Sequence, residues 1–244
     1  MKEVLNIFII IILFLIICTL CGFSLCTWRK LYVAHIAPAK PLNKSLRLHV
    51  FSKKKQNDLQ TIVKRVSSTL KSSGILHWPI GGTLIGCLRH QGPIPWDDDA
   101  DFGVLSKDWP QVKKSLEEAW PKKIKIKKAF FYKLNLFYKI SFKDLHGDLD
   151  IFLYKKNDCG LIKLEGVLSN FLYKSQEIKD QPVIKDVLQY GDITLDFIGD
   201  PIDTCNTQFP GWDKTYVIHP AHSNYDRVFG VFRHRRYCPA NTPY

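Results

Sequence analysis

The chain has 244 residues and a formal net charge of +12 at pH 7. Four of its seven cysteines, at positions 87, 159, 205 and 238, lie outside an apolar N-terminal run. They show neither a Cys-x-x-Cys nor a Cys/His spacing, which argues against a zinc site. One disulfide, for example Cys205–Cys238, is possible if the domain is lumenal, but sequence spacing does not assign the pairing.

An uncharged run from Val4 to Trp28 predicts a single membrane-spanning helix. A helix of this length measures about 37 Å, and a bilayer's hydrocarbon core is about 30 Å thick. A cleaved signal peptide is the alternative, although its apolar core usually has only about 7–15 residues. We therefore assign residues 1–28 to an anchor, 29–55 to a stem rich in proline and lysine, and 56–244 to one compact domain.

The charges that flank the apolar run do not fix its orientation, because Lys2 lies on one side and Arg29 and Lys30 lie on the other. One N-glycosylation pattern, Asn43-Lys44-Ser45, would suit a lumenal stem. We expect a single-pass membrane protein of the Golgi or endoplasmic reticulum with its domain in the lumen.

Apolar periodicity and turn residues predict alternating helices and strands in the first half of the domain. The apolar stripe of DLQTIVKRVSSTLKSS ends at Gly74, a fitting helix stop. The expected elements are a helix over 58–73, a buried strand over 75–80, a short helix over 83–90, a strand over 94–105 and a helix over about 108–119.

The lysine-rich stretch from Lys122 to Lys143 predicts two antiparallel strands whose lysines, Lys139 among them, face solvent. A surface for an anionic glycan or lipid is the alternative for these lysines. HGDLDIFLYKK, residues 146–156, predicts a further strand. Short strands and turns are expected from residue 160 onward, with a helix near 222–229.

The stretch GGTLIGCLRHQGPIPWDDDADFG, residues 81–103, combines a glycine pair with a group of acids. Gly81 and Gly82 precede a helix, where free backbone amides and the helix dipole could bind an anion. A simple turn is the more common reason for a Gly-Gly pair. Arg89 and His90 follow one to two turns later on the same helix.

The acids Asp97, Asp98, Asp99 and Asp101 gather negative charge in a basic chain. Two like charges about 4 Å apart repel by roughly 4 kcal/mol at an effective dielectric constant near 20, so a nearby cation is expected. In a strand, the acids at odd positions would share one face, and carboxylates suit hard divalent cations. An acidic surface loop is the alternative.

Asp148 and Asp150 share a face of the later strand. Acids on two strands beside a phosphate-binding turn describe metal-assisted attack on a phosphate. His146 would either position Asp148 or face solvent.

The stretch IGGTLIGCLRHQGPIPWDDDADFGV resembles the hallmark of the LicD/fukutin family, roughly GG(S/T)LLG–RH–IPWDDDxD. The resemblance covers about residues 75–155 and is weaker over 218–230. It implies an α+β fold, with a nucleotidyltransferase-like mixed sheet flanked by helices, here preceded by the single membrane helix. Cys87 departs from the family's small residue, and the short chain has no room for the extra N-terminal domain of larger members, which leaves acceptor specificity open.

Position by position, the resemblance implies that Asp99, Asp101 and Asp150 bind Mg²⁺ or Mn²⁺ and that Asp97 is a further catalytic acid. The implied substrate-binding residues are Gly81, Gly82, Thr83, Arg89 and His90.

We therefore expect a membrane-anchored, metal-dependent transferase that moves ribitol-, glycerol- or choline-phosphate from a CDP carrier to a glycan acceptor. The alternative is a catalytically silent, membrane-tethered binding or scaffold module of the same fold, against which the intact acids argue. A nucleic-acid nucleotidyltransferase would explain both the basic charge and the acids. The anchor and the Arg-His and Pro-Trp signature oppose it, so no nucleic-acid partner is expected.

Overall fold

The computed structural model describes residues 12–13, 16, 40–41, 51–129, 137–158, 160–165, 178–218 and 235–238. The chain divides into two compact units. One unit is Arg47–Asp213, and the other combines Met1–Leu46 with Lys214–Tyr244. The acids singled out in the sequence all lie in the first of these units.

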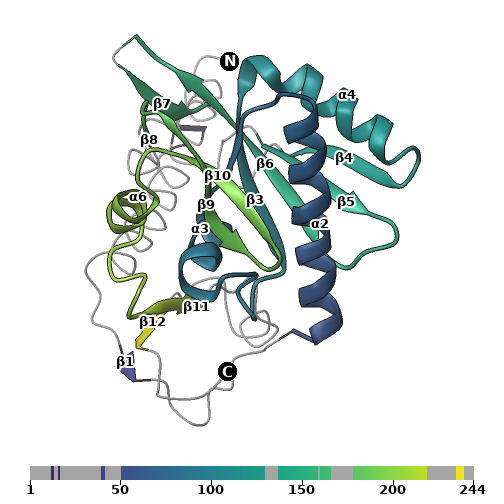
Figure 1. The fold of residues 1–244 in the computed structure, drawn as a ribbon. Coiled ribbons are helices and arrows are strands. Elements are labelled where there is room, and N and C mark those ends of the chain that lie inside the picture. The colour runs from purple at the N-terminus through teal and green to yellow at the C-terminus, as the bar shows by residue number, and fades with distance from the viewer. Residues whose placement is uncertain are drawn as a thin grey trace, which may run out of the picture. The chain divides into compact units, whose positions relative to one another are not determined.

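A mixed sheet forms the centre of the unit Arg47–Asp213, which confirms the α+β class (Figure 1). Strands β3 and β6 are parallel, and their neighbours pair with them antiparallel. The path runs β2 (His77–Pro79), β3 (Asp99–Leu105), β6 (Asp148–Lys156), β5 (Phe137–Phe142) and β4 (Ile124–Ala129), with β7 (Leu161–Leu164) on β6 and β8 (Ile178–Lys179) on β7.

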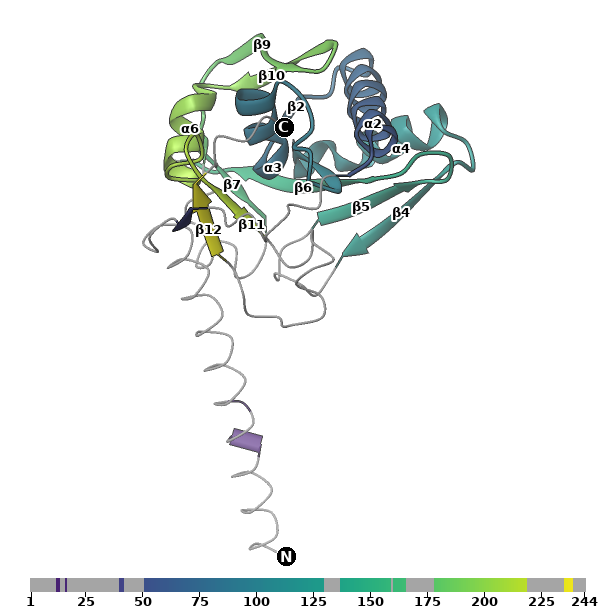
Figure 2. The same ribbon diagram turned by 90° about the horizontal axis from the view of Figure 1, so that it is seen from below.

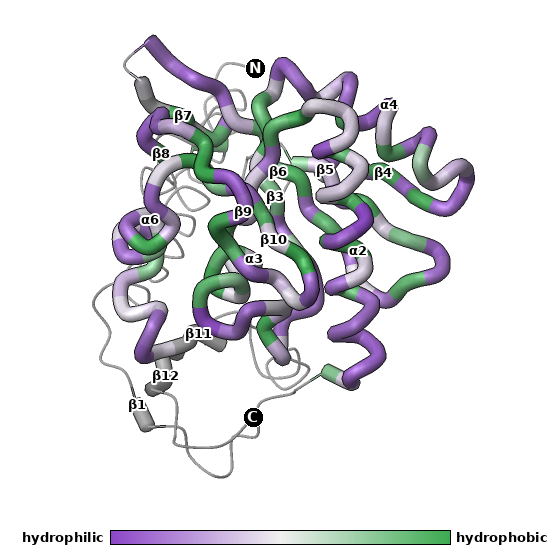
Figure 3. Tube along the Cα trace, in the orientation of Figure 1, coloured by the Kyte–Doolittle hydropathy of each residue, from purple (hydrophilic) through white to green (hydrophobic). Residues whose placement is uncertain are grey.

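Helices α2 (Lys53–Ser72) and α4 (Trp109–Ala119) cover one face of this sheet (Figure 2). Helix α2 begins inside the predicted stem because the Ser52 side chain caps it by accepting a hydrogen bond from the backbone of Lys55. Its outer turns are hydrophilic (Figure 3). Its buried apolar residues are the predicted stripe, namely Leu59, Ile62, Val63, Val66 and Leu70.

The sheet residues beneath α2 alternate as a half-buried strand requires. Each fully buried apolar side chain contributes roughly 1.5–3 kcal/mol relative to an exposed one. This face is therefore part of the hydrophobic core. The opposite face carries the acids toward one end of β3 and β6, and the buried aromatic residues Trp78 and Tyr154 toward the other end. The buried residues of β3, β6 and β5 on the core face are Ala100, Phe102, Val104, Leu149, Ile151, Leu153 and Ile140.

The predicted short helix is present as α3 (Gly81–Ile85), which continues as one π-helical turn, η1 (Gly86–His90). A short 3₁₀ turn, η2 (Ser106–Asp108), precedes α4. Later in the chain, β9 (Val183–Tyr190) and β10 (Ile193–Ile198) form an antiparallel hairpin.

Helix α6 (Pro201–Gln208) was not predicted, although Asp200 caps it by accepting hydrogen bonds from two backbone amides and Pro201 occupies its first position. This Asp-Pro pair is the signal that sequence reasoning missed. The helix predicted near 222–229 lies outside the described residues.

The second unit contains a three-stranded sheet in the order β1 (Lys40–Pro41), β12 (Arg235–Cys238) and β11 (Tyr216–Ile218). Within the described parts of the chain, no helix has the length and apolar character needed to cross a bilayer. The predicted anchor lies outside these parts except at residues 12, 13 and 16, which are helical. Cys205 is a free, buried thiol.

A buried histidine joins α2 to the edge of the main sheet. The ring of His77 on β2 is almost fully buried, with Nε2 2.8 Å from Ser67 Oγ on α2 and Nδ1 3.0 Å from the backbone oxygen of Ile75. Burial lowers the pKa of His77 from its ordinary value of 6.5, since a charged imidazole is poorly solvated there.

This lowered pKa predicts a loss of stability in mild acid. Below about pH 6.5 the unfolded chain takes up a proton at His77 that the folded chain does not, so the free energy of unfolding must fall with pH. The fall is at most about 1.4 kcal/mol for each pH unit. Urea unfolding at pH 7, 6 and 5 should show a steeper decline for the wild type than for His77→Gln. Parallel declines would contradict the assignment.

Candidate functional site

Strand pairing brings two acids of β3 beside two acids of β6. In the parallel register, Asp99 lies opposite Asp148, and Asp101 lies opposite Asp150. Lys139 of β5 lies opposite Asp150 in the antiparallel register on the other side of β6. Residues directly opposite each other share a face of a sheet. These five side chains therefore occupy the face that α2 and α4 leave uncovered, which we call the acid face.

Asp97 and Asp98 precede β3 instead of starting it. The expected strand over 94–105 begins only at Asp99, because Pro95 has no amide hydrogen for a ladder and the backbone turns. The amide of Asp97 closes this turn on the backbone oxygen of Ile94 at 3.0 Å. The sequence predicted that strand alternation would place Asp97 on the same face as Asp99 and Asp101. This prediction is wrong, because Asp97 precedes the strand.

The turn nonetheless brings three carboxylates together. Oxygens of Asp97, Asp98 and Asp99, the turn acids, all lie within 4.8 Å of one another. This spacing is close to the roughly 4 Å that separates opposite ligands of an octahedral magnesium ion. Among the described residues, these three acids are the group with metal-ligand spacing. The donor set, carboxylate oxygens alone, fits a hard divalent cation.

Gly81 and Gly82 lie against the same acids. A Cβ atom on Gly82 would lie 2.3 Å from an oxygen of Asp97, and one on Gly81 would lie 3.0 Å from an oxygen of Asp101. Gly81 also has a φ of +55°, which L side chains rarely adopt. The glycine pair therefore lets the turn approach the carboxylates. An anion bound at this turn would meet negative charge unless a cation lay between them.

Thr83 holds this turn to β3. Its Oγ1 accepts a hydrogen bond from the amide of Asp101 at 2.7 Å, and Thr83 is buried. The amide of Ile80 donates to the backbone oxygen of Asp101 at 3.1 Å. Thr83, predicted to bind substrate, thus positions the backbone of an acid.

Lys139 is the cation that the structure places among the acids. Its Nζ lies 2.8 Å from Asp150 Oδ1, and 3.7 Å from the Oδ2 atoms of both Asp99 and Asp148. We call Asp99, Asp148 and Asp150 the strand acids. The prediction that Lys139 faces solvent is wrong, because the register of β5 and β6 sets it opposite Asp150.

Asp150 is the most buried of these acids. Burial raises its pKa to about 6, against the opposing effect of Lys139. Its Oδ1 is buried and has no hydrogen-bond partner of good geometry, so the nearby ammonium is an ion pair only. Burial also lowers the pKa of Lys139, but its acids outweigh this effect and hold that pKa above 10.5.

The predicted metal ligands Asp99, Asp101 and Asp150 lie on one face of the sheet, with Asp101 opposite Asp150. Asp99 belongs to both the turn acids and the strand acids, and Lys139 lies between Asp99 and Asp150. The sequence placed Asp148 on the same strand face as Asp150 but did not include it among the predicted site residues. In the structure Asp148 lies opposite Asp99 and 3.7 Å from Lys139 Nζ.

Arg89 and His90 form part of a polar contact beside the site. Arg89 donates through Nη1 to the backbone oxygen of Trp212 at 2.8 Å, and through Nε to His90 Nε2 at 3.0 Å. Burial, followed by the charge of Arg89, lowers the pKa of His90 to about 4, so its ring is neutral at pH 7. The His90 ring packs edge-on against Trp96, in the turn that leads to the acids.

His146 does not position Asp148. Its Nδ1 lies 2.8 Å from Asp58 Oδ2 on α2, and its backbone amide donates to the same oxygen at 3.1 Å. Lys54 also pairs with Asp58 at 2.8 Å, and with His146 it lowers the pKa of Asp58 to about 2. These contacts hold the loop before β6 to α2.

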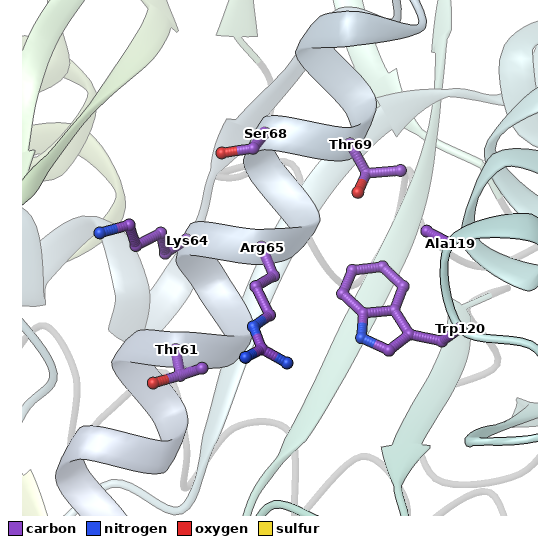
Figure 4. A pocket seen from close by; sticks show the side chains of 7 residues that line it. All are labelled: Thr61, Lys64, Arg65, Ser68, Thr69, Ala119 and Trp120. Carbon is purple, nitrogen blue, oxygen red and sulfur yellow. The ribbon is translucent and has the colours of Figure 1, made fainter.

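A hollow lies between α2 and the end of α4 (Figure 4). It is an open groove of about 630 Å³, lined by basic, hydroxyl and aromatic side chains, and it lies away from the acid face. No acid lines it, so it lacks the chemistry that the acid face offers. Its lining residues are Thr61, Lys64, Arg65, Ser68, Thr69, Ala119 and Trp120.

Residues 74–179 match the family profile LicD/FKTN/FKRP, nucleotidyltransferase domain, which confirms the resemblance drawn from residues 81–103. The uncharacterised protein RT0683 of Rickettsia typhi is 30% identical over 174 residues, which is 70% of this chain and 52% of that protein. This chain therefore spans about half the length of that relative. The ribitol 5-phosphate transferase FKRP of Homo sapiens is 38% identical over 50 residues, 20% of this chain and 10% of FKRP.

Among solved structures, the antibiotic-resistance factor ANT(2'')-Ia aligns with a TM-score of 0.33 and 15% identity. The alignment covers 46% of this chain and 54% of that one.

The contact between Thr83 and Asp101 predicts different effects for two substitutions of Thr83. Thr83→Val keeps the shape but leaves the Asp101 amide without its acceptor, which typically costs about 1–3 kcal/mol for a buried group. Thr83→Ser keeps the hydroxyl and should lose less. Free energies of unfolding from urea titrations measure both. A small loss for Thr83→Val together with a larger loss for Thr83→Ser would mean that the threonine contributes packing alone.

Proposed function

We propose that the protein is a divalent-metal-dependent transferase of phospho-alcohol groups, because residues 74–179 match the nucleotidyltransferase domain of the LicD/FKTN/FKRP family. In this proposal the donor is a CDP-linked ribitol, glycerol or choline, and the acceptor is a glycan. The observation that carries the proposal is the convergence of acids from β3 and β6 beside the Gly81-Gly82 turn.

Asp97, Asp98 and Asp99 are the residues best placed to hold the metal ion, with Asp101 beside them on β3. When bound, Mg²⁺ or Mn²⁺ would neutralise the charge of the donor's phosphates. Gly81 and Gly82 leave room for such a phosphate next to the acids, where any side chain would clash with a carboxylate. Arg89 and His90 hold the turn in place through Trp212 and Trp96.

The reaction exchanges one phosphorus–oxygen bond for another. An acceptor hydroxyl oxygen forms a bond to the phosphorus that carries the alcohol. The bond from that phosphorus to the bridging oxygen of the CDP group breaks, and CMP leaves with the electron pair. The hydroxyl proton passes to a carboxylate of the acid face.

We also propose that the uncharged run from Val4 to Trp28 anchors the protein in a membrane of the secretory pathway, with the domain in the lumen. The support is the length and composition of the run, together with the acceptor pattern at Asn43.

The proposed activity predicts CMP release from a CDP-linked donor in the presence of Mg²⁺ or Mn²⁺. Purified full-length protein is incubated with CDP-ribitol, CDP-glycerol and CDP-choline, each with a candidate glycan, and CMP is measured. Asp99→Asn keeps the side chain's volume but removes a charge shared by both groups of acids, so the rate should fall about a hundredfold or more. A loss of this size corresponds to about 2.7 kcal/mol of transition-state stabilisation.

Arg65→Ala, in the groove between α2 and α4, is the matched control and should retain the wild-type rate. If the wild type binds CDP-linked donors but releases no CMP with any of them, the silent binding module becomes the better description. Full turnover by Asp99→Asn would show that the acids are surface charge.

The proposed anchor predicts that the protein stays in the membrane pellet after alkaline carbonate extraction. A version that lacks residues 1–28 should move to the supernatant, because the apolar run is removed. Recovery of the full-length protein in the supernatant would exclude the anchor. In sealed vesicles, digestion of the domain by added protease would exclude the lumenal placement.

A further inference from the structure

The groove between α2 and the end of α4 gathers hydrogen-bond donors that the described part of the chain does not use. Its volume of about 630 Å³ falls within the range of roughly 300–1,000 Å³ that small-molecule sites occupy. Arg65, Ser68 and Thr69 follow the three- and four-residue spacing of one helix face, so they lie together along α2. Figure 4 shows this edge of α2 across the groove from Trp120, which ends α4.

Arg65 supplies a positive charge that no carboxylate of the described residues neutralises. Its side chain is exposed and takes part in none of the ion pairs found there. Lys64, the other basic residue of the lining, is already paired with Asp192 between β9 and β10. None of the lining residues is an acid, so the five N–H donors of the Arg65 guanidinium are available to a ligand.

Two hydroxyl groups and an indole extend this row of donors. The hydroxyl of Thr61 donates to the backbone oxygen four residues earlier at 2.8 Å, as hydroxyls within helices often do. The hydroxyls of Ser68 and Thr69 make no such bond to any described residue. In Figure 4 the ring nitrogen of Trp120 lies on the edge of the indole that faces Arg65. The donors of both helices therefore point into the same groove.

These groups define the chemistry of a ligand. A guanidinium binds a carboxylate through two parallel hydrogen bonds, and hydroxyl groups donate to and accept from other hydroxyl groups. The indole of Trp120 is mostly buried and packs edge-on against Phe142, so it forms a fixed apolar wall. A sugar that carries a carboxylate offers a partner for each of these features. An acidic peptide lacks the hydroxyl groups, and a small inorganic anion lacks the apolar ring.

We propose that the groove between α2 and α4 is a binding site for an acidic sugar, whose carboxylate pairs with Arg65 and whose hydroxyl groups contact Ser68 and Thr69. Helices α2 and α4 cover one face of the main sheet, and the acid face is the opposite one. The groove is therefore separate from the site of the proposed transferase reaction and takes no part in CMP release. The inference does not depend on that reaction, because sugar binding is measured without a donor.

The test measures binding of a tetrasaccharide of galacturonic acid to the full-length protein by isothermal titration calorimetry. The fully methyl-esterified tetrasaccharide is the comparison, because it has the same rings and hydroxyl groups but no charge. The acid should bind about tenfold more tightly than the ester or better, since a hydrogen-bonded charge pair is lost in the ester. Equal affinities, or no binding of the acid, would overturn the proposal.

Arg65→Ala should weaken binding of the acid about tenfold and leave binding of the ester unchanged. Arg65→Lys should recover only part of the loss, because an ammonium lacks the planar fork of the guanidinium. Arg65 is exposed and unpaired among the described residues, so both variants should melt at the temperature of the wild type. Wild-type affinity of Arg65→Ala for the acid would overturn the proposal.

Lys114→Ala is the matched control, because it removes the same charge from an exposed side chain of α4 outside the groove. Its affinity for the acid should equal that of the wild type. Equal losses for Lys114→Ala and Arg65→Ala would mean that the net charge of the chain attracts the sugar, which would overturn the assignment to the groove. A tetraglutamate peptide should not displace the bound sugar at equal concentration. Displacement would replace the sugar by an acidic peptide as the ligand.

Discussion

The parallel pairing of β3 with β6 is the constraint on which the site depends. Parallel neighbours in register place Asp99 beside Asp148 and Asp101 beside Asp150, on the face that the helices leave uncovered. Four carboxylates on two adjacent strands would repel one another strongly in a partly buried position. The apolar residues of the same two strands, packed beneath α2, supply the stability that holds these strands in register in spite of that repulsion.

The ammonium group of Lys139 divides the acids into two groups, because it pairs with Asp99, Asp148 and Asp150. Lys139 of β5 lies beside the more buried acids, and the turn acids keep their carboxylate oxygens within 4.8 Å of one another. The glycine pair lets the α3 turn lie against these carboxylates, since a Cβ on Gly82 would lie 2.3 Å from an oxygen of Asp97. A phosphate that approached this turn would be repelled by the acids alone. The proposed metal binding at the turn acids and the proposed phosphate binding at the glycines would therefore depend on each other.

Several residues near the site act on the scaffold. Thr83 joins the turn to the Asp101 backbone, Arg89 joins η1 to the loop after α6, and His146 joins the loop before β6 to α2. The residue types that suggested substrate binding or catalysis at these three positions are also good hydrogen-bonding groups. The hydrogen bonds that Thr83, Arg89 and His146 make within the protein account for the presence of these residue types without a ligand. They fix the turn acids and the strand acids relative to each other, which is what a precise metal position needs.

Local sequence determined those features that depend on neighbours along the chain. The apolar stripe of α2, the Gly-Gly turn before a short helix, the strands around residues 77, 102 and 150, and the family resemblance of residues 81–103 all follow from periodicity or from contiguous motifs. The start of β3 was misplaced because the Ile94–Asp97 turn competes with strand pairing, and α6 was missed because its Asp-Pro start was not weighed.

Only the tertiary structure decided which residues from distant strands meet. A lysine in an alternating, lysine-rich strand is by its local pattern a solvated side chain, and nothing near Lys139 in the chain distinguishes it from Lys127. The pairing of β5 with β6, and its exact register, sets Lys139 opposite Asp150 and leaves Lys127 exposed. A shift of one residue would turn Lys139 to the helix-covered face. Register is a property of the whole sheet, so the sequence by itself could locate the acids but not the cation that accompanies them.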